Sequence, residues 1–390
     1  IVPPNSMSAI VLISGTEATE YNFLELSPVS ISGFVYADDD DDGNRDSTEV
    51  GIAGVKIELL DGAGAKTGAA TTTDATGFYR FDGLKPGSTY GVAETQPQGY
   101  FDGTDTAGTS GGAAHNPGDS ITEAVLTTGS VAEEYNFGEL RPASISGRVH
   151  GELNGDCIPD PGEPLLAGVT IYLLDGSGNR IASTKTDSLG KYIFKDLEPG
   201  IYGVEEIQPE GYLQGVTHVG TAGGKLLSAD LIAGADLGPG VDGLEYNFCE
   251  AVPASISGYV FQDGSVIMIT EGDEMPDPAT LRDGKLTSDD RRLEGVVMTL
   301  GDGSGAAELD AAGNPIRTLT DENGYYEFRD LEKGIYTIIE SQPEDLLDSI
   351  DTAGSKGGIA INPSDEIDPF LLNQLTVDPN DDAIIRIPLA

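Results

Sequence analysis

The sequence contains no tryptophan, only two cysteines and few basic residues in a chain of 390. Two cysteines exclude a scaffold held together by many disulfides. No apolar run approaches the roughly 18 to 20 residues that a membrane-spanning helix needs. With 66 acidic residues against 21 basic ones, the formal net charge is −45. Such a chain repels nucleic acids and anionic surfaces, so we expect neither nucleic-acid binding nor membrane insertion in this segment.

What the chain does contain is glycine (53), proline (22) and short apolar runs that alternate with polar residues. This combination predicts many short strands joined by tight turns, and a hydrophobic content of 38% argues against disorder. The acidic residues then have two explanations. They hold cations, which predicts clusters at fixed spacing, or they coat the surface of a protein from a saline habitat, which predicts a diffuse scatter.

Three sequence markers recur along the chain, two of them with a period of 111 to 114 residues. Ser-Ile-Ser-Gly begins at residues 30, 144 and 255, and Glu-Tyr-Asn-Phe begins at residues 20, 134 and 245. A third marker, with Gly first and Phe fifth, begins at residues 77, 190 and 324. The period is the size of one Ig-like domain. We therefore predict an all-β protein of tandem Ig-like sandwiches, each with about seven to nine strands, that together form an elongated rod.

The markers divide the chain into repeats 27–140, 141–251 and 252–390, with 1–26 as the C-terminal strands of a preceding repeat. Every joint has the same length and carries a proline, which predicts stiff connections. Repeat 3 lacks its last strand, and residues 5–13 resemble 382–390. We favour a natural chain that continues past Ala390 into another such strand. In the alternative, the N-terminal strand of one copy completes repeat 3 of the next and builds a filament.

An acidic loop follows the first strand of repeat 1. Residues 38–49 fit the pattern D-x-[DN]-x-[DN]-G-x5-E at every position. In such loops the oxygens of positions 1, 3, 5 and 12 converge on a hard cation, and glycine at position 6 permits a sharp turn. Five successive carboxylates repel one another strongly without a cation. We predict Ca²⁺ bound by Asp38, Asp40, Asp42, Asn44, Asp46 and Glu49.

Repeats 2 and 3 carry weaker copies of this loop. In repeat 2, Cys157 replaces the glycine, and in repeat 3 an insertion of roughly twenty residues splits the loop. Aspartate at position 12 of repeat 3 reaches less far than glutamate, so we expect weaker calcium binding there or a preference for magnesium. The predicted ligands are Glu152, Asn154, Asp156, Asp160 and Glu163 in repeat 2, and Asp263, Asp283 and Asp290 in repeat 3.

The ordered set of motifs resembles the SdrD B-like and Cna B-type repeats of bacterial surface proteins. It comprises Ile-Ser-Gly, the acidic loop, Gly-Ile-Ala-Gly-Val, Thr-Asp-x-x-Gly-x-Tyr-x-Phe, Pro-x-Gly-Tyr and Tyr-Asn-Phe, and it covers nearly the whole chain. The resemblance implies Ig-like sandwiches outside the cell that bind calcium and project an adhesive domain. It supports Asp38, Asp40, Asp42 and Glu49 as ligands, while repeat 3 departs from the pattern at 343–346.

Related Cna B-type domains carry a Lys–Asn isopeptide crosslink assisted by an acid. The resemblance places that acid at Glu94, Glu205 and Glu340, and the last strands carry Asn22, Asn136 and Asn247. The first strands, 30–36, 144–150 and 255–261, contain no lysine. We therefore predict no isopeptide bonds and interpret these glutamates and asparagines as structural groups with satisfied hydrogen bonds.

No catalytic motif stands out, and the three histidines share no repeat position, so we do not expect an enzyme. We predict a calcium-stiffened stalk or filament segment at the cell surface whose partners are neighbouring repeats, with other surface proteins or glycans as further candidates. The alternatives are a ligand-binding surface module and accessory domains of an extracellular enzyme. Asp102 and Asp105 form a polar turn or a second cation site. Cys157 and Cys249 form a disulfide or remain separate thiols.

Overall fold

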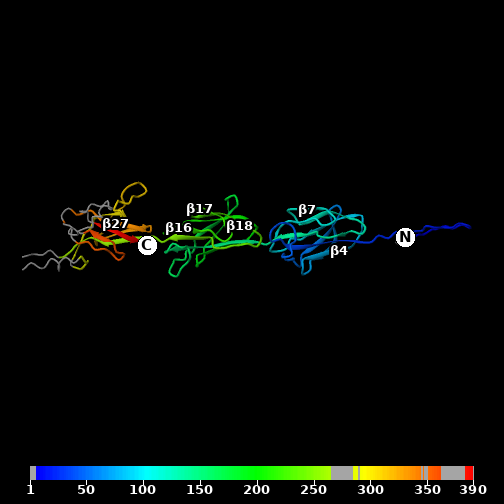
Figure 1. The fold of residues 1–390 in the computed structure, drawn as a ribbon, viewed down its shortest axis with the longest axis horizontal. Coiled ribbons are helices and arrows are strands. Elements are labelled where there is room, and N and C mark those ends of the chain that lie inside the picture. Colours follow the sequence, from blue (N-terminus) through cyan, green and yellow to red (C-terminus); the bar gives the residue numbers. More distant parts are fainter. Residues whose placement is uncertain are drawn as a thin grey trace, which may run out of the picture.

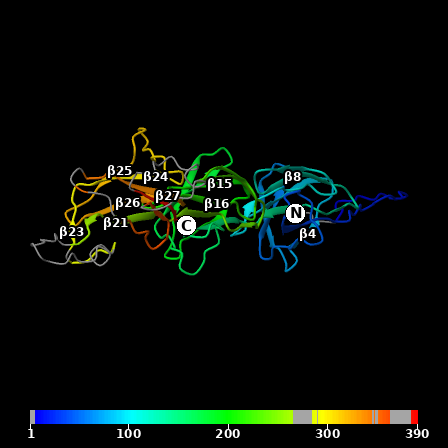
Figure 2. The same cartoon turned by 60° about the vertical axis from the view of Figure 1, so that its left-hand side comes forward.

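The computed structural model describes residues 6–264, 284–288, 290–343, 346, 350–361 and 383–389. Every regular element in these ranges is a β-strand, so the predicted all-β class is confirmed. Figures 1 and 2 show three sandwiches arranged end to end along one long axis. A search of the described residues finds no helix with the length and apolar character needed to cross a membrane.

Repeat 1 is built from ten strands in two five-stranded sheets. One sheet has the order β4-β1-β10-β6 with β9 also on β1, and the other has the order β3-β2-β5-β8-β7. The strands are β1 (Val29–Ala37), β2 (Lys56–Asp61), β3 (Lys66–Thr72), β4 (Phe78–Leu84), β5 (Ser88–Glu94), β6 (Phe101–Asp102), β7 (Ala113–His115), β8 (Ser120–Leu126), β9 (Val131–Ala132) and β10 (Phe137–Leu140).

Repeat 2 has the same arrangement, with sheets ordered β14-β11-β20-β16 (β19 also on β11) and β13-β12-β15-β18-β17. Its strands are β11 (Ala143–Glu152), β12 (Thr170–Asp175), β13 (Arg180–Lys185), β14 (Lys191–Leu197), β15 (Gly200–Glu206), β16 (Leu213–His218), β17 (Lys225–Ser228), β18 (Leu231–Leu237), β19 (Asp242–Gly243) and β20 (Asn247–Ala251). The count exceeds the predicted seven to nine because short strands flank the loops and because the last strand is divided in two.

The described part of repeat 3 contains a five-stranded sheet ordered β25-β24-β27-β29-β28 and the pairs β21-β26 and β22-β23. Its strands are β21 (Ala254–Tyr259), β22 (Phe261–Gln262), β23 (Arg291–Arg292), β24 (Val297–Asp302), β25 (Arg317–Leu319), β26 (Tyr325–Leu331), β27 (Gly334–Glu340), β28 (Ile359–Ile361) and β29 (Ala383–Leu389).

The division of the last strand has a visible backbone cause. Glu134 lies between β9 and β10 with a φ of 66°, and Glu245 lies between β19 and β20 with a φ of 63°. Both halves run parallel to the first strand: Ile31 pairs with Ala132 in β9, and Val35 pairs with Phe137 in β10. The left-handed residue interrupts the last strand, and its two halves pair with separate stretches of β1.

In repeats 1 and 2, the glycine of the Ser-Ile-Ser-Gly motif marks the point where the last strand approaches the first most closely. A Cβ atom on Gly33 would lie 1.7 Å from the carbonyl oxygen of Tyr135, and one on Gly147 would lie 1.7 Å from that of Tyr246. Tyr79 Oη donates a hydrogen bond of 2.6 Å to the same Tyr135 carbonyl. Only glycine allows this approach, which explains why the motif contains it.

The cores of repeats 1 and 2 lie between their two sheets and contain both aromatic residues of the Tyr-Asn-Phe marker. In repeat 1 the fully buried side chains include Ile31, Val35, Ile57, Val92, Tyr135 and Phe137. In repeat 3, a cavity of about 400 Å³ opens between the described strands. Its lining includes Ile256, Met298, Tyr326, Ile338, Ile387 and Leu389. Two predictions for what fills this cavity remain: a last strand in a chain that continues past Ala390, or the N-terminal strand of another copy.

The segment that precedes repeat 1 carries the local geometry of a last strand without a sandwich. Residues 6–28 are exposed, yet Glu20 has a φ of 67°, close to the values at Glu134 and Glu245. The left-handed turn before Tyr-Asn-Phe is therefore a property of this local sequence. That residues 1–26 belong to a preceding repeat stays a prediction, and residues 1–5 lie outside the described residues.

We predict that Gly147→Ala destabilises repeat 2 by about 3 kcal/mol, because a methyl group would force the last strand away from the first. Gly200→Ala in the same repeat is the control, since its nearest neighbouring atom lies 3.6 Å from the added carbon and its φ is not positive. Urea unfolding of both variants measures the difference. Equal stabilities would contradict the role of Gly147 as the point of closest approach.

Candidate metal sites

The loop after β1 brings its predicted acidic ligands together. Oxygen atoms of Asp38, Asp40 and Asp42 lie within 4.8 Å of one another, with Asp38 fully buried and the other two exposed. Gly43, at loop position 6, has a φ of 73°, and a Cβ atom there would lie 2.6 Å from Thr104 Cγ2. Three carboxylates at this spacing match the hard-oxygen ligands that calcium prefers.

Glu49, at loop position 12, ties the two ends of the loop together. Its Oε1 accepts a hydrogen bond of 2.9 Å from Asp39 N, and its Oε2 accepts one of 2.8 Å from Asp46 N. Asp46 is not part of the cluster of three carboxylates. Asn44 N donates to Asp42 Oδ1 at 2.7 Å, and position 7 contributes a backbone carbonyl in loops of this kind.

The electrostatics of this loop favour a bound cation. The pKa of Asp38 is raised to about 6, by burial first and also by the charge of Glu49, against hydrogen bonds from the backbone of Gly43 and Asp42 that lower it. Tyr36, fully buried beside Asp38, also has a raised pKa, through burial first and then through the charges of these acids. A cation would offset both the burial cost and the repulsion between carboxylates.

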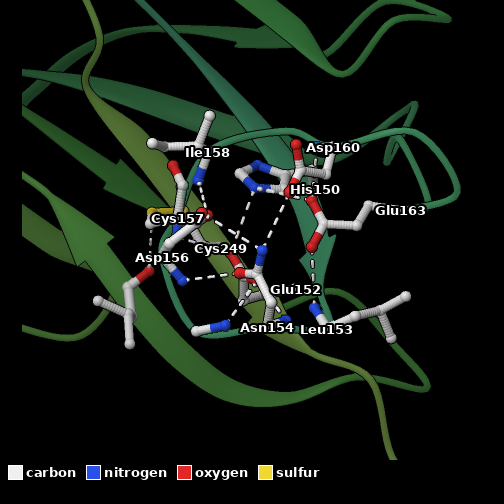
Figure 3. Close-up of polar contacts among 12 residues, drawn as sticks. His150, Glu152, Leu153, Asn154, Asp156, Cys157, Ile158, Asp160, Glu163 and Cys249 are labelled. Atoms are coloured by element: carbon white, nitrogen blue, oxygen red, sulfur yellow. Dashed lines mark hydrogen bonds and ion pairs between the residues drawn. A yellow bond between two sulfur atoms is a disulfide. The ribbon is translucent and has the colours of Figure 1, made fainter.

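The loop of repeat 2 follows the same path but is closed by a covalent bond. Cys157 occupies the glycine position with a φ of 57° and forms a disulfide with Cys249 in β20, so the structure contains the bridge rather than two separate thiols. Figure 3 shows the disulfide on one side of the loop and a group of polar side chains on the other. By alignment of the motifs, the bridged pair occupies the places of Gly43 and Gly138 in repeat 1.

Hydrogen bonds inside this loop differ from those of repeat 1. Glu152 accepts from the backbone N–H groups of Asn154, Gly155 and Cys157, and the pKa of Glu152 is lowered to about 2 by these and other hydrogen bonds, against burial that raises it. The Asn154 side-chain amide donates to Asp156 at 3.3 Å and to Asp160 at 3.0 Å. The Asn154 amide therefore occupies a carboxylate oxygen of both Asp156 and Asp160.

Sequence reasoning missed one residue of this site. His150, in β11, is fully buried, and its Nε2 lies 3.7 Å from Glu152 and 3.9 Å from Glu163. It occupies the position of Tyr36 in repeat 1, two residues before the first loop ligand. That place, directly before an acidic loop, was the available signal. The comparison of repeats did not point to His150, because no other repeat has a histidine at this position.

In repeat 3 the structure describes two of the three predicted ligands. Asp263 Oδ2 accepts a hydrogen bond of 2.8 Å from Gly284 N, and Asp290 Oδ1 accepts one of 2.8 Å from Gly264 N. Asp283 lies outside the described residues. Asp290 has a lowered pKa because the backbone of Gly264 and Thr287 donates to it. Each carboxylate thus connects the two parts of the loop that the insertion separates.

The resemblance placed an acid at Glu205, and the structure corrects this to Glu206. Glu206 is almost fully buried on the core side of β15, in the place that Glu94 occupies in β5, whereas Glu205 points outward and binds Arg180 at 2.7 and 2.8 Å. Glu206 lies two residues after the buried Val204, so the strand alternation was the signal that identifies it.

Glu94 and Glu206 lack the hydrogen-bond donors that buried carboxylates usually have. No hydrogen-bond donor in the described structure reaches Glu94 or Glu206, and each faces a second acid, Glu139 or Glu250. Burial first, and then the partner carboxyl, raise the pKa of Glu94 to about 11 and that of Glu206 to about 10. Each pair can therefore form a hydrogen bond only when one carboxyl holds a proton. Of the glutamates interpreted as satisfied groups, Glu205 is satisfied by Arg180, whereas Glu94 gains a partner only when its pair with Glu139 holds a proton.

The asparagines of the last strands do have the expected structural role. Asn136 Oδ1 accepts a hydrogen bond of 2.9 Å from Phe34 N, and Asn247 Oδ1 accepts one of 3.0 Å from Arg148 N. They join the last strand to the first beside the left-handed glutamate. That no isopeptide bond forms stays a prediction.

Comparison with known families gives the same picture of the chain. The family described as "SdrD B-like domain" matches residues 29–139 and 143–231, which is just over half of the chain. The chain belongs to the SdrD B-like domain family. One relative is serine-aspartate repeat-containing protein F of Staphylococcus epidermidis. It is 31% identical over 338 residues, which cover 84% of this chain and 17% of that protein.

A second relative of these SdrD B-like repeats, serine-aspartate repeat-containing protein E of Staphylococcus aureus, is 32% identical over 327 residues. The match covers 82% of this chain and 26% of that protein, so the chain spans about a sixth to a quarter of such relatives. Among solved structures, the major pilin subunit BcpA of Bacillus cereus is 14% identical, with 85% of this chain and 91% of that chain covered and a TM-score of 0.33. A score of that size establishes no shared arrangement.

We predict that calcium stabilises the first SdrD B-like repeat through the loop at 38–49. With a Kd near 10⁻⁴ M and 1 mM calcium, linkage contributes about 1.4 kcal/mol, or about 5 to 10 °C in the Tm of a domain of this size. Asp38→Asn combined with Asp42→Asn should abolish the shift, and Glu123→Gln combined with Glu133→Gln, two exposed acids, should preserve it. Calorimetry in chelator and in calcium gives the answer; a shift that survives the loop substitutions would refute the site.

We also predict that repeat 2 loses stability as pH rises from about 5 to 9 in chelator. The pKa of Glu206 in the folded state, about 10, lies above its unfolded value, so the folded state binds the extra proton and alkaline pH removes that stabilisation. Glu206→Gln should flatten the dependence, whereas Glu205→Gln, which loses only the exposed pair with Arg180, should leave it unchanged. Unfolding midpoints at several pH values test this, and identical slopes in both variants would count against it.

Proposed function

We propose that this chain is a stiff structural stalk segment of a large bacterial cell-surface protein, in which Ca²⁺ bound in the acidic loops fixes each repeat against the next. Its family membership and its relatives support a surface role, and the row of sandwiches supports an elongated shape (Figure 1). The proposal assigns calcium to the loops of repeats 1 and 3. In repeat 2 the disulfide already closes the loop.

The observation that carries the proposal is the position of the loops. Asp38, the first ligand of the repeat 1 loop, donates its N–H to Glu139 O at 2.9 Å, and Glu139 is in β10, the strand that leads directly into the joint. In repeat 2, Glu152 at the start of the loop pairs with Ala251 at the end of β20, again just before the joint. A cation in such a loop would order the end of the repeat where the joint to the next repeat begins.

The first joint also makes direct contacts to both sides. Arg141 Nη1 lies 2.9 Å from Asp39 Oδ1, the second residue of the repeat 1 loop. Arg141 O accepts a hydrogen bond of 3.0 Å from Gly240 N, which lies in repeat 2. An ordered loop would hold Asp39 in place, and Asp39 would in turn hold the arginine that links the two repeats. An exposed ion pair alone contributes little, so the covalent path of the joint and the loop must act together.

We assign the segment a structural rather than a catalytic role. Among the described residues, the acidic loops of repeats 1 and 2 are bonded to the strands that lead into the joints, and the buried acids Glu94, Glu139, Glu206 and Glu250 form two pairs inside the sandwiches. Partners on this proposal are neighbouring repeats and, beyond this segment, other surface proteins or glycans. A ligand-binding surface module and accessory domains of an extracellular enzyme are the alternatives.

Small-angle X-ray scattering of the full chain tests the proposal. In 1 mM calcium we expect the maximum dimension of a straight rod, and in chelator a broader distribution of shorter dimensions, because the loop at the first joint loses its order. Asp38→Asn with Asp42→Asn should scatter like the chelated protein even in calcium, and Glu123→Gln with Glu133→Gln should scatter like the unmodified chain. A rod of the same length and rigidity under all conditions would leave calcium without a role in stiffness.

A further inference from the structure

We propose that repeat 2 contains a transition-metal site, formed by His150, Glu152 and Glu163, in place of a calcium site. Nε2 of the histidine and one oxygen from each glutamate lie within 4.8 Å of one another (Figure 3). The site would take a divalent ion such as Zn²⁺, for which imidazole and carboxylate are both good ligands.

The distances from the histidine to the two carboxylates fit a shared ion better than direct bonding. Nε2 is 3.7 Å from Glu152 Oε2 and 3.9 Å from Glu163 Oε2, which is too long for a hydrogen bond. Two ligand atoms that each lie about 2.1 Å from one zinc ion are separated by roughly 3.4 to 4 Å. The gap between the histidine and the two carboxylates therefore has the size that an ion needs.

The histidine is the second, independent sign of a ligand. His150 is fully buried, and neither of its ring nitrogens has a hydrogen-bond partner in the described structure. A neutral imidazole carries a lone pair on one of its ring nitrogens and can bind a metal ion through it. A buried imidazole without any partner is costly, and a metal ion at Nε2 would remove that cost.

The two carboxylates are buried and already oriented. Glu152 and Glu163 are each only 9% exposed. Glu163 accepts hydrogen bonds from Leu153 N at 3.0 Å and Asp160 N at 2.8 Å, and Glu152 accepts three from the loop backbone. Backbone donors of this kind fix the direction of metal-binding carboxylates. A divalent ion would also neutralise two negative charges that share a buried space.

Calcium fits the same residues poorly. Calcium takes six to eight oxygen ligands, whereas the position next to the loop supplies a nitrogen. Two of the remaining loop acids, Asp156 and Asp160, receive hydrogen bonds from the Asn154 amide and are exposed. In repeat 1 the residue at the place of His150 is Tyr36, and there the cluster of three consists of aspartates alone. The two loops therefore differ in the chemistry of their ligands.

Cobalt(II) absorption of the full-length chain with its disulfide intact tests the site. Cobalt should produce visible d–d bands with one equivalent, zinc should abolish them, and 10 mM calcium should not. His150→Tyr, which restores the residue of repeat 1, should remove the bands. His115→Asn and His218→Asn, at the exposed histidines, should retain them. Circular dichroism and the Tm establish that each variant folds.

Proton NMR of the histidine rings tests the site without any substitution. The chain has three histidines, so zinc should shift the ring signals of His150 alone and leave those of His115 and His218 in place. Three results would overturn the proposal: no tight cobalt or zinc equivalent, bands that persist in the His150→Tyr variant, or displacement of cobalt by calcium. The last result would identify an ordinary calcium loop. Failure of repeat 1 to bind calcium would leave this site unaffected.

Discussion

The parallel pairing of the last strand with the first is the contact on which each repeat depends. In repeats 1 and 2 it requires glycine at the point of closest approach, Gly33 or Gly147, because a carbonyl oxygen of the last strand occupies the place of a Cβ atom. The pairing buries Tyr135 and Phe137 in one core and Tyr246 and Phe248 in the other. It also brings the acidic loop after the first strand against the residues that lead into the joint.

The same pairing explains which acids become unusual. Glu139 and Glu250 follow the Tyr-Asn-Phe marker by two residues and meet Glu94 and Glu206 beneath the sheet. Gln96, two residues after Glu94, donates to Glu139, and Gln208, two residues after Glu206, donates to Glu250. A closed sandwich thus places two carboxyls in a low-dielectric space, where they must share a proton. Their charge state follows from the topology of the fold.

Repeats 1 and 2 use different chemistry at one position in the fold. Gly43 and Gly138 in repeat 1 correspond to Cys157 and Cys249 in repeat 2, and Tyr36 corresponds to His150. The disulfide ties the loop of repeat 2 to its last strand, which is the connection that a calcium-ordered loop would make in repeat 1. We interpret these differences as two ways to fix the end of a repeat before the next one begins.

Much of this could be predicted from the sequence because the period of the repeat, the turn residues and the loop spacing are local signals. Asp38, Asp40 and Asp42 are close together in sequence, so their proximity in space followed from the pattern alone. Glu206 and His150 also had local signals, in the strand alternation and in the place directly before an acidic loop. The partner of Glu94 could not be predicted, since it depends on pairing across about 45 residues. A one-residue shift in β15 separates a surface ion pair from a buried acid.

The most direct test of the central claim measures the first joint itself. Spin labels on cysteines introduced at Ala69 in β3 and Ala182 in β13, two exposed positions on equivalent strands, report the distance between repeats 1 and 2. Pulsed electron resonance in calcium should give one narrow distance distribution, and chelation should broaden it. Equal widths with and without calcium would contradict the claim that the loop cation fixes one repeat against the next.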